Sequence, residues 1–268
     1  MSQVGPIATN QVGTAVGQGR LAWGDALILV ALTFLAFAPV PMVRSGLAAV
    51  GIALLAATWL WPQSFNLTAS VLVAALCLFF GLAGQWFVWP AYLLVPGVIA
   101  VAASFAARKG ENIMVAARLG RFGPGEWAMI LVISAVAATA LLAWVRVLEP
   151  DLSRLRTLIP AWPLAALIAA GAAFSMMNAV LEEFIWRGVL LQWLSSIFSP
   201  VWAVIVQAVS FGALHYTGFP SGLVGVALAT IYGAMTGALA LRSGGLLAPV
   251  TAHISADVVI FVILASSA

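Results

Sequence analysis

Residues 181–190 read LEEFIWRGVL, and this stretch decides how the rest of the chain must be arranged. Glu182 and Glu183 are two of only 8 acidic residues in the 268-residue chain, and apolar runs lie on both sides of them. A charged side chain inside a bilayer costs at least about 2.5 kcal/mol. Two adjacent carboxylates in such surroundings indicate a functional site. The simpler alternative is a charge cluster at a helix end whose side chains reach the lipid headgroups.

The composition identifies the class of protein. Hydrophobic residues make up 64% of the chain and charged residues 7%, and the mean hydropathy is +1.13. Such a chain differs strongly from ordinary globular domains and predicts an integral membrane protein with several helical spans. The net charge of +3 reflects scarce acidic residues, so nothing supports nucleic-acid binding. The single cysteine, Cys77, excludes an internal disulfide.

The apolar segments predict an all-α, polytopic transmembrane helical bundle of about 8 to 9 spans. Residues 1–19 are polar and predict a disordered cytoplasmic tail. Residues 20–125 are expected to form accessory N-terminal spans that end in a polar linker, with a short surface helix over 108–126. Residues 126–268 are expected to form the functional core. The expected spans are 26–39, 47–61, 67–87, 91–107, 127–147, 162–194, 200–216, 221–241 and 246–265.

The distribution of basic residues gives a weak preference for a cytoplasmic N-terminus. The abundance of Ala, Gly, Leu, Val and Arg favours a bacterial chain, and therefore a multi-pass protein of the cytoplasmic (inner) membrane. Many of the 11 tryptophans, Trp89 and Trp144 among them, lie near predicted span ends. They fit the interfacial belts that tryptophan forms in membrane proteins, and we assign them no chemistry.

The paired glutamates belong to a polar helix face. Glu183 and Arg187 are four residues apart, so they share a helix face and can form an ion pair within the apolar region. Glu182 is rotated by about 100° from Glu183 and is free to face another helix. Asn178, four residues earlier, lies on the same face as Glu182.

Two later spans carry the only histidines of the chain. Gln207, Phe211 and His215 follow one another at intervals of four residues in one span, and His253 and Asp257 are four residues apart in the last. Each histidine therefore shares its helix face with another polar residue. Taken singly, a histidine at such a place is explained by polar contacts between helices.

The helical rise places these residues at similar depths in the bilayer. From one membrane side, Glu182 is expected at about 18 Å, His215 at about 22 Å, and His253 and Asp257 at about 10 and 16 Å. Three helices can therefore bring one carboxylate and two imidazoles together. In a partly dry site, the carboxylate can take a proton from water, and the imidazoles can orient that water or stabilise the oxyanion of peptide hydrolysis.

Three ordered motifs resemble those of the CAAX-processing intramembrane proteases, the family of prenyl-protein endopeptidases and bacteriocin-processing proteins also called CPBP or ABI. The first is Glu182-Glu183, three residues, then Arg187-Gly188. The second joins Phe211 to His215 and the third joins His253 to Asp257, each across three residues. The resemblance covers about residues 160–265 and leaves residues 1–125 unmatched. The metalloprotease motif HExxH and the hydrolase motif GxSxG do not occur.

The resemblance implies a protease core and a glutamate-dependent or metallo-type endopeptidase that acts on a membrane-associated protein or peptide. It implies that Glu182 and His215 activate the water and that His253 and Asp257 form the oxyanion site. Arg187 would then hold Glu183 in a structural role. The family most often has Asn at the position of Asp257, and Asp donates a hydrogen bond only when protonated. Asp257 is therefore either held neutral or orients His253 as an acceptor.

The use of zinc by the site and the alternative functions of the chain stay open. Glu182, His215 and His253 match a ligand set known for catalytic zinc, with Asp257 and Gln207 as candidates to orient the histidines. We favour a site without metal, because three ligands would leave no separate base except Glu183. The chain could also be a catalytically silent family member that acts in bacteriocin self-immunity or as a membrane partner, or it could be a small proton-coupled transporter. The retained motifs oppose a silent member, and the lack of an internal repeat opposes a transporter.

Overall fold

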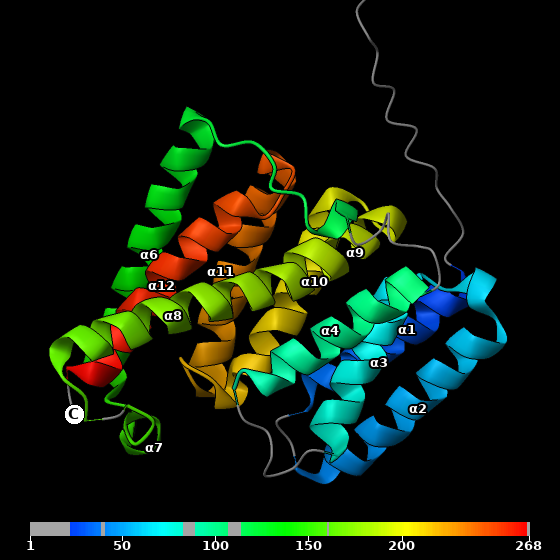
Figure 1. Ribbon diagram of the computed structural model, residues 1–268, viewed down its shortest axis with the longest axis horizontal. Coiled ribbons are helices and arrows are strands. Elements are labelled where there is room, and N and C mark those ends of the chain that lie inside the picture. The colour runs from blue at the N-terminus through cyan, green and yellow to red at the C-terminus, as the bar shows by residue number, and fades with distance from the viewer. Residues whose placement is uncertain (1–21, 39–40, 83–88, 107–113, 160, 267–268) are drawn as a thin grey trace, which may run out of the picture.

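The structure is a computed structural model that describes residues 22–38, 41–82, 89–106, 114–159 and 161–266. Within these residues the chain is helical and contains no β-strand, which confirms the all-α class. The predicted tail at 1–19 and the first part of the predicted surface helix, 108–113, lie outside the described residues. Figure 1 shows two groups of helices, one from the N-terminal and one from the C-terminal part of the chain.

The N-terminal group is built around one buried helix, α3 (Leu67–Leu82). Residues 68–77 of α3 are all buried, as expected for a helix that is apolar on every side. Helix α3 packs against α1 (Trp23–Ala36), α2 (Arg44–Leu60) and α4 (Ala91–Ala106). The short 3₁₀ turns η1 (Pro41–Val43) and η2 (Pro62–Ser64) lie on either side of α2.

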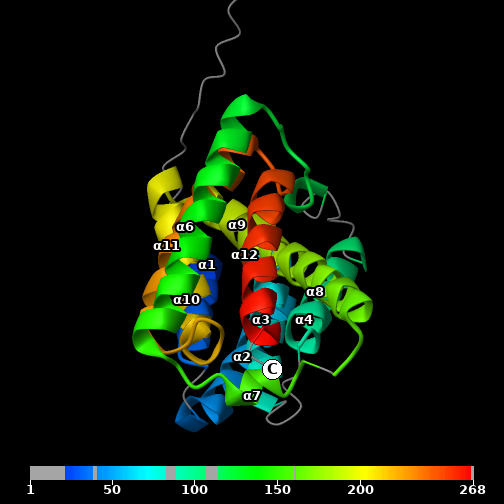
Figure 2. The same cartoon turned by 90° about the vertical axis from the view of Figure 1, so that its left-hand side faces the viewer.

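The C-terminal group is centred on α12 (Leu247–Ala265), which packs against α6, α8 and α11 (Figures 1 and 2). Helix α10 packs closely on α11, because glycines stand where the two helices meet. A Cβ added at Gly233 would lie 3.2 Å from the Cα of Ala208, so the absence of a side chain at Gly233 lets the two helices approach closely. The other elements are α6 (Pro124–Leu148), α7 (Ser153–Arg156), α8 (Leu164–Glu183), η4 (Phe184–Leu190), α9 (Leu191–Ile197), α10 (Pro200–Leu214), η5 (His215–Thr217) and α11 (Gly222–Ser243).

The linker before α6 is fixed to the turn between α11 and α12. The amide of Arg121 donates to the carbonyl of Ser243 at 2.7 Å, and the amide of Leu246 donates to the carbonyl of Arg118 at 2.8 Å. Gly120 has φ +78°, and a Cβ there would lie 2.6 Å from the nitrogen of Gly245, so a side chain would be strained at this position. The linker thereby holds the end of α12 from which the third motif follows.

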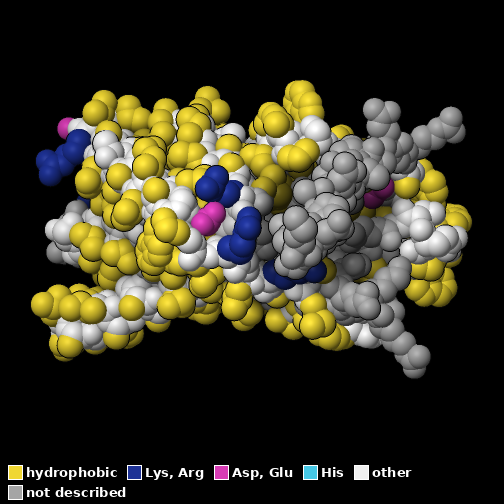
Figure 3. Space-filling model, turned by 90° about the horizontal axis from the view of Figure 1, so that it is seen from above, with side chains coloured by type: hydrophobic (Ala, Val, Ile, Leu, Met, Phe, Trp, Pro, Cys, Tyr) yellow, Lys and Arg dark blue, Asp and Glu magenta, His cyan; other side chains and the backbone are white. Residues whose placement is uncertain are grey.

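Four helices are long and apolar enough to cross a membrane: Pro124–Leu148, Leu164–Ile197, Gly222–Ser243 and Leu247–Ala265. Helices α1 to α4 are apolar but shorter, so the expected number of spans is not confirmed. At a rise of about 1.5 Å per residue, a helix of 16 residues, such as α3, covers less than the thickness of the hydrocarbon core. Apolar side chains are spread widely over the described part of the surface seen from above (Figure 3).

Candidate active site

The two glutamates lie where helix α8 changes its winding. Helix α8 ends at Glu183 and continues as a π-helix, η4, through Leu190. Within η4 every residue from 185 to 190 is buried. Such π segments occur frequently at functional sites, whereas the spacing of the motif predicts only an ordinary α-helix. Gly188 is required here because a Cβ would lie 2.6 Å from the carbonyl oxygen of Ala116 in the linker.

Glu183 is the central acceptor of the site. Its Oε1 lies 3.0 Å from Arg187 in a fully buried ion pair, the pair that the four-residue spacing predicts. The same oxygen lies 2.7 Å from Nδ1 of His253. A carboxylate paired with a guanidinium accepts hydrogen bonds, so Nδ1 of His253 carries the hydrogen. This bond directs Nε2 of His253 away from Glu183.

Arg187 is held by three different groups. It pairs with Glu183, and a second guanidinium nitrogen donates to the hydroxyl of Thr236 on α11. That hydroxyl in turn donates to the carbonyl of Tyr232 at 2.9 Å. The guanidinium also lies 4.5 Å from the ring centre of Phe211, a cation–π contact. Arg187 therefore connects η4 to both α10 and α11, and its whole side chain is inside the bundle.

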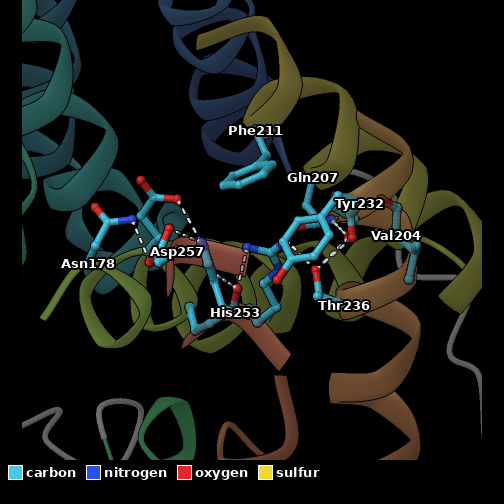
Figure 4. A network of polar contacts seen from close by, with 12 residues as sticks. Asn178, Val204, Gln207, Phe211, Tyr232, Thr236, His253 and Asp257 are labelled. Atoms are coloured by element: carbon cyan, nitrogen blue, oxygen red, sulfur yellow. Dashed lines mark hydrogen bonds and ion pairs between the residues drawn. The ribbon is translucent and has the colours of Figure 1, made fainter. Parts of the chain in front are cut away.

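Nε2 of His253 faces two carboxyl groups. It lies 3.7 Å from Oε2 of Glu182 and 3.8 Å from Oδ1 of Asp257. Both separations are too long for a hydrogen bond. Oε2 of Glu182 is buried and has no hydrogen-bond partner among the described residues. The structure thus brings Glu182, His253 and Asp257 together at one point, and Figure 4 shows His253 next to Asp257.

His215 lies next to Phe211, whose ring also lies near His253. It is the first residue of η5, and its Nδ1 lies 3.0 Å from the carbonyl oxygen of Phe211. A carbonyl only accepts, so Nδ1 carries the hydrogen and Nε2 of the neutral ring keeps a lone pair. The ring of Phe211 lies 4.6 Å from the ring of His215 and 6.4 Å from that of His253. This hydrogen bond joins His215 to the residue four positions earlier in the chain, at the end of α10.

Gln207 has a different role from the one the sequence suggests. Its amide nitrogen donates to the carbonyl of Gly233 at 2.8 Å, which joins α10 to α11 and does not orient His215. Among the residues that the structure describes, no three His, Cys, Asp or Glu side chains form a group that could hold a metal ion. The role of zinc stays a prediction to be tested.

Three residues of the site were not singled out by sequence reasoning: Tyr232, Thr236 and Trp89. Tyr232 lies with its ring 5.5 Å from His253, and its hydroxyl is buried without a hydrogen-bond partner among the described residues. Tyr232 and Thr236 are four residues apart in an apolar span, the same polar spacing that marks the other motifs.

Trp89 and Trp144 differ from the interfacial role expected for the tryptophans. The indole nitrogen of Trp89 donates to Oδ1 of Asn178 at 2.9 Å, and Asn178 donates to Oδ2 of Asp257 at 3.2 Å. Trp144 is also buried, 5.0 Å from Phe219. No spacing rule could have found Trp89, because it comes from the N-terminal part of the chain.

Comparison with known protein families matches the region of the chain that contains the three motifs. Residues 163–259 match the family model Rce1-like, described as type II CAAX prenyl endopeptidase Rce1-like. Comparisons with curated proteins and with solved structures found no match. The matched residues include all three motifs and the helices that carry them, which confirms the predicted resemblance. Residues 163–259 therefore form an Rce1-like domain of the CAAX-processing intramembrane protease family.

Proposed function

We propose that this protein is an intramembrane endopeptidase that hydrolyses a peptide bond near the membrane in a membrane-associated protein or peptide. One observation carries the proposal. A buried carboxylate oxygen of Glu182, which has no hydrogen-bond partner in the described part of the chain, faces Nε2 of His253, while Glu183 holds the other nitrogen of that imidazole. Attack by water on a carbonyl requires a base that takes a proton from the water and a hydrogen-bond donor that stabilises the oxyanion. Glu182 and the imidazole of His253 are placed next to each other and can fill these two roles.

The reaction follows from the donor and acceptor properties of these atoms. Glu182 accepts a proton from water as the water oxygen bonds to the carbonyl carbon, and the carbonyl oxygen becomes an oxyanion. The Nδ1–H of His253 donates to Glu183, and the protonated imidazole presents its Nε2–H to that oxyanion. When the C–N bond breaks, Glu182 returns its proton to the leaving nitrogen. One water is consumed, and a carboxyl terminus and an amine are formed.

His215 would support the nucleophile from the neighbouring helix. The hydrogen bond between its Nδ1 and the carbonyl of Phe211 leaves the Nε2 lone pair as an acceptor for the attacking water. Phe211 lies near both imidazoles, and we assign each imidazole to a different part of the reaction. This division agrees with the roles that the family resemblance implies for His215 and His253.

The substrate class follows from where the site lies. Glu182, Glu183, His253 and Asp257 are buried within helices that are long and apolar enough to cross a membrane, which favours a substrate anchored in the bilayer. A prenylated CAAX protein, a membrane-bound propeptide or a C-terminal sorting tail each meets this condition. We propose the bacterial cytoplasmic membrane as the location.

The test is a comparison of protein termini in membranes that contain the parent protein or the Glu182→Gln variant. New termini should form only with the parent, and a synthetic peptide across the same bond should be cleaved by the purified parent. A fluorogenic prenylated CAAX peptide tests the best-known substrate class of the family directly. Identical termini in the two membranes, with no cleavage of either peptide, would support the silent-member alternative.

A further inference from the structure

A chain of hydrogen bonds runs from the N-terminal group of helices into the active site. Trp89 lies just before α4, and its indole packs 5.0 Å from the ring of Phe174 on α8. The indole N–H donates to Oδ1 of Asn178 at 2.9 Å. The amide nitrogen of Asn178 then donates to Oδ2 of Asp257 at 3.2 Å (Figure 4). Asn178 and Asp257 are both buried, so water does not compete freely with these bonds.

The direction of this chain is set by its first member. An indole nitrogen can only donate a hydrogen bond, so the oxygen of the Asn178 amide must face Trp89. The amide group of Asn178 is planar, and its nitrogen must therefore face Asp257. Oδ2 of Asp257 is consequently an acceptor. Any proton on this carboxyl group would have to sit on Oδ1, the oxygen that lies 3.8 Å from Nε2 of His253.

We propose that Trp89 is a positioning residue of the active site. It fixes the Asn178 amide as a donor, and Asn178 in turn fixes the rotation of the Asp257 carboxyl group beside His253. Oδ2 of Asp257 is then held as an acceptor of Asn178, and Oδ1 is placed 3.8 Å from Nε2 of His253. The inference rests on the proposed function of the site. It gives the N-terminal helices a part in catalysis that goes beyond support of the bundle.

The structure supplies a matched control for this proposal. A second indole, that of Trp193 on α9, donates to Oδ1 of Asp25 on α1 at 2.9 Å. This bond has the same length and the same chemistry, and it also joins the two groups of helices. It does not touch a residue of the site. A role in holding the two groups together would be shared by Trp193 and Trp89, whereas a role in positioning Asp257 belongs to Trp89 alone.

The experiment measures peptide cleavage by the full-length protein in lipid nanodiscs, with the fluorogenic prenylated peptide or with a peptide found by the comparison of termini. Trp89→Phe keeps the ring and removes only the donor. It should lower kcat about tenfold with KM unchanged, the effect of one hydrogen bond lost from the transition state. Trp193→Phe should match the parent. Asn178→Ala should lower kcat at least as much as Trp89→Phe.

The double variant Trp89→Phe/Asn178→Ala should be no slower than Asn178→Ala, because the first residue acts through the second. Multiplying losses in the double variant would show that Trp89 acts independently of Asn178 and would overturn the proposal. Equal kcat for Trp89→Phe and Trp193→Phe would overturn it as well.

A measurement without turnover separates this proposal from the proposed function. If Glu182→Gln cleaves as fast as the parent, or the parent cleaves no peptide, the proposed function fails. The hydrogen-bond chain from Trp89 through Asn178 to Asp257 is then tested by infrared spectroscopy of protein made with isotope-labelled aspartate. The carboxyl band of Asp257 is assigned by its loss in Asp257→Asn. Trp89→Phe should shift this band and Trp193→Phe should not. An unshifted band in Trp89→Phe would overturn the proposal that Trp89 positions Asp257.

Discussion

Glu183 holds His253 by a hydrogen bond of 2.7 Å between Oε1 and Nδ1, and both side chains are buried. The same oxygen is paired with Arg187, so Oε1 of Glu183 contacts both an imidazole and a guanidinium. Oε2 of each glutamate is buried and has no hydrogen-bond partner among the described residues. The difference between the two glutamates is that Oε2 of Glu182 lies 3.7 Å from Nε2 of His253, whereas Glu183 is paired with Arg187, so we assign the role of base to Glu182.

We expect Arg187→Ala to lower stability far more than Glu182→Gln. Removal of one member of a buried ion pair leaves the other charge uncompensated, at a cost of about 3–5 kcal/mol. The Ala variant also loses the contacts of Arg187 with Thr236 and Phe211. Thermal unfolding of the purified variants in detergent measures the effect, with Arg187→Lys as the variant that keeps the charge. An Ala variant that melts like the parent and loses only activity would make Arg187 a ligand of substrate or water.

Glu182→Gln should abolish cleavage while the protein inserts and purifies normally. The loss of a general base lowers the rate by about 10²–10⁴-fold, and the substitution is nearly isosteric. Initial rates and the melting temperature should be compared with those of the parent. Glu149→Gln changes an exposed acid at the end of α6 and should leave cleavage unchanged. Near-parental cleavage by Glu182→Gln would remove Glu182 from the role of base.

The sequence predicts the parts of the site that depend on helix geometry alone. A spacing of four residues predicts the ion pair of Glu183 with Arg187, and the helical rise brings Glu182 to the depth of His253 and Asp257. Depth does not fix rotation about the helix axis, so the contact of the His215 ring with Phe211, at 4.6 Å between ring centres, could not be predicted. The π-helix at Phe184–Leu190 depends on neighbouring segments such as the linker at Ala116.

The contact between Trp89 and Asn178 joins residues 89 positions apart, which no local pattern reports. The nine predicted apolar segments are found as helices within the described residues. The segment predicted at 26–39 is as long as α1, which has 14 residues, and the segment predicted at 47–61 is shorter than α2, which has 17. The ends predicted at residues 87 and 107 lie outside the described residues. The division of the chain at residue 125 stays a prediction, and the family match begins only at residue 163.

The orientation in the membrane can be tested with one cysteine. Ser195 is exposed on α9, and its hydroxyl bonds only to the carbonyl of Leu191 in the same helix, so Ser195→Cys should be tolerated. The Cys77→Ala background removes the single native thiol, which is buried. If the distribution of basic residues sets the orientation, this end of α9 is cytoplasmic. An impermeant thiol reagent should then label the cysteine only after the cells are opened. Labelling in intact cells would invert the topology.

The last prediction concerns zinc. Glu182, His215 and His253 are a possible ligand set, but three ligands would occupy the residue to which we assign the role of base. Glu183 could not replace it, because it already pairs with Arg187 and bonds His253. We therefore expect purified, active protein to keep its cleavage rate after exhaustive chelation and dialysis, and elemental analysis to find less zinc than one ion per chain.

The control for this experiment is the same protein after dialysis without chelator, which separates loss of metal from loss of lipid or of folded protein. Zinc in a one-to-one ratio, whose removal stops cleavage and whose return restores it, would make Glu182 a ligand. The proposed base would then be wrong, and the Glu182→Gln variant would be expected to lose zinc together with activity. Activity that survives chelation, combined with an inactive Glu182→Gln variant, leaves Glu182 as the base that takes the proton from water.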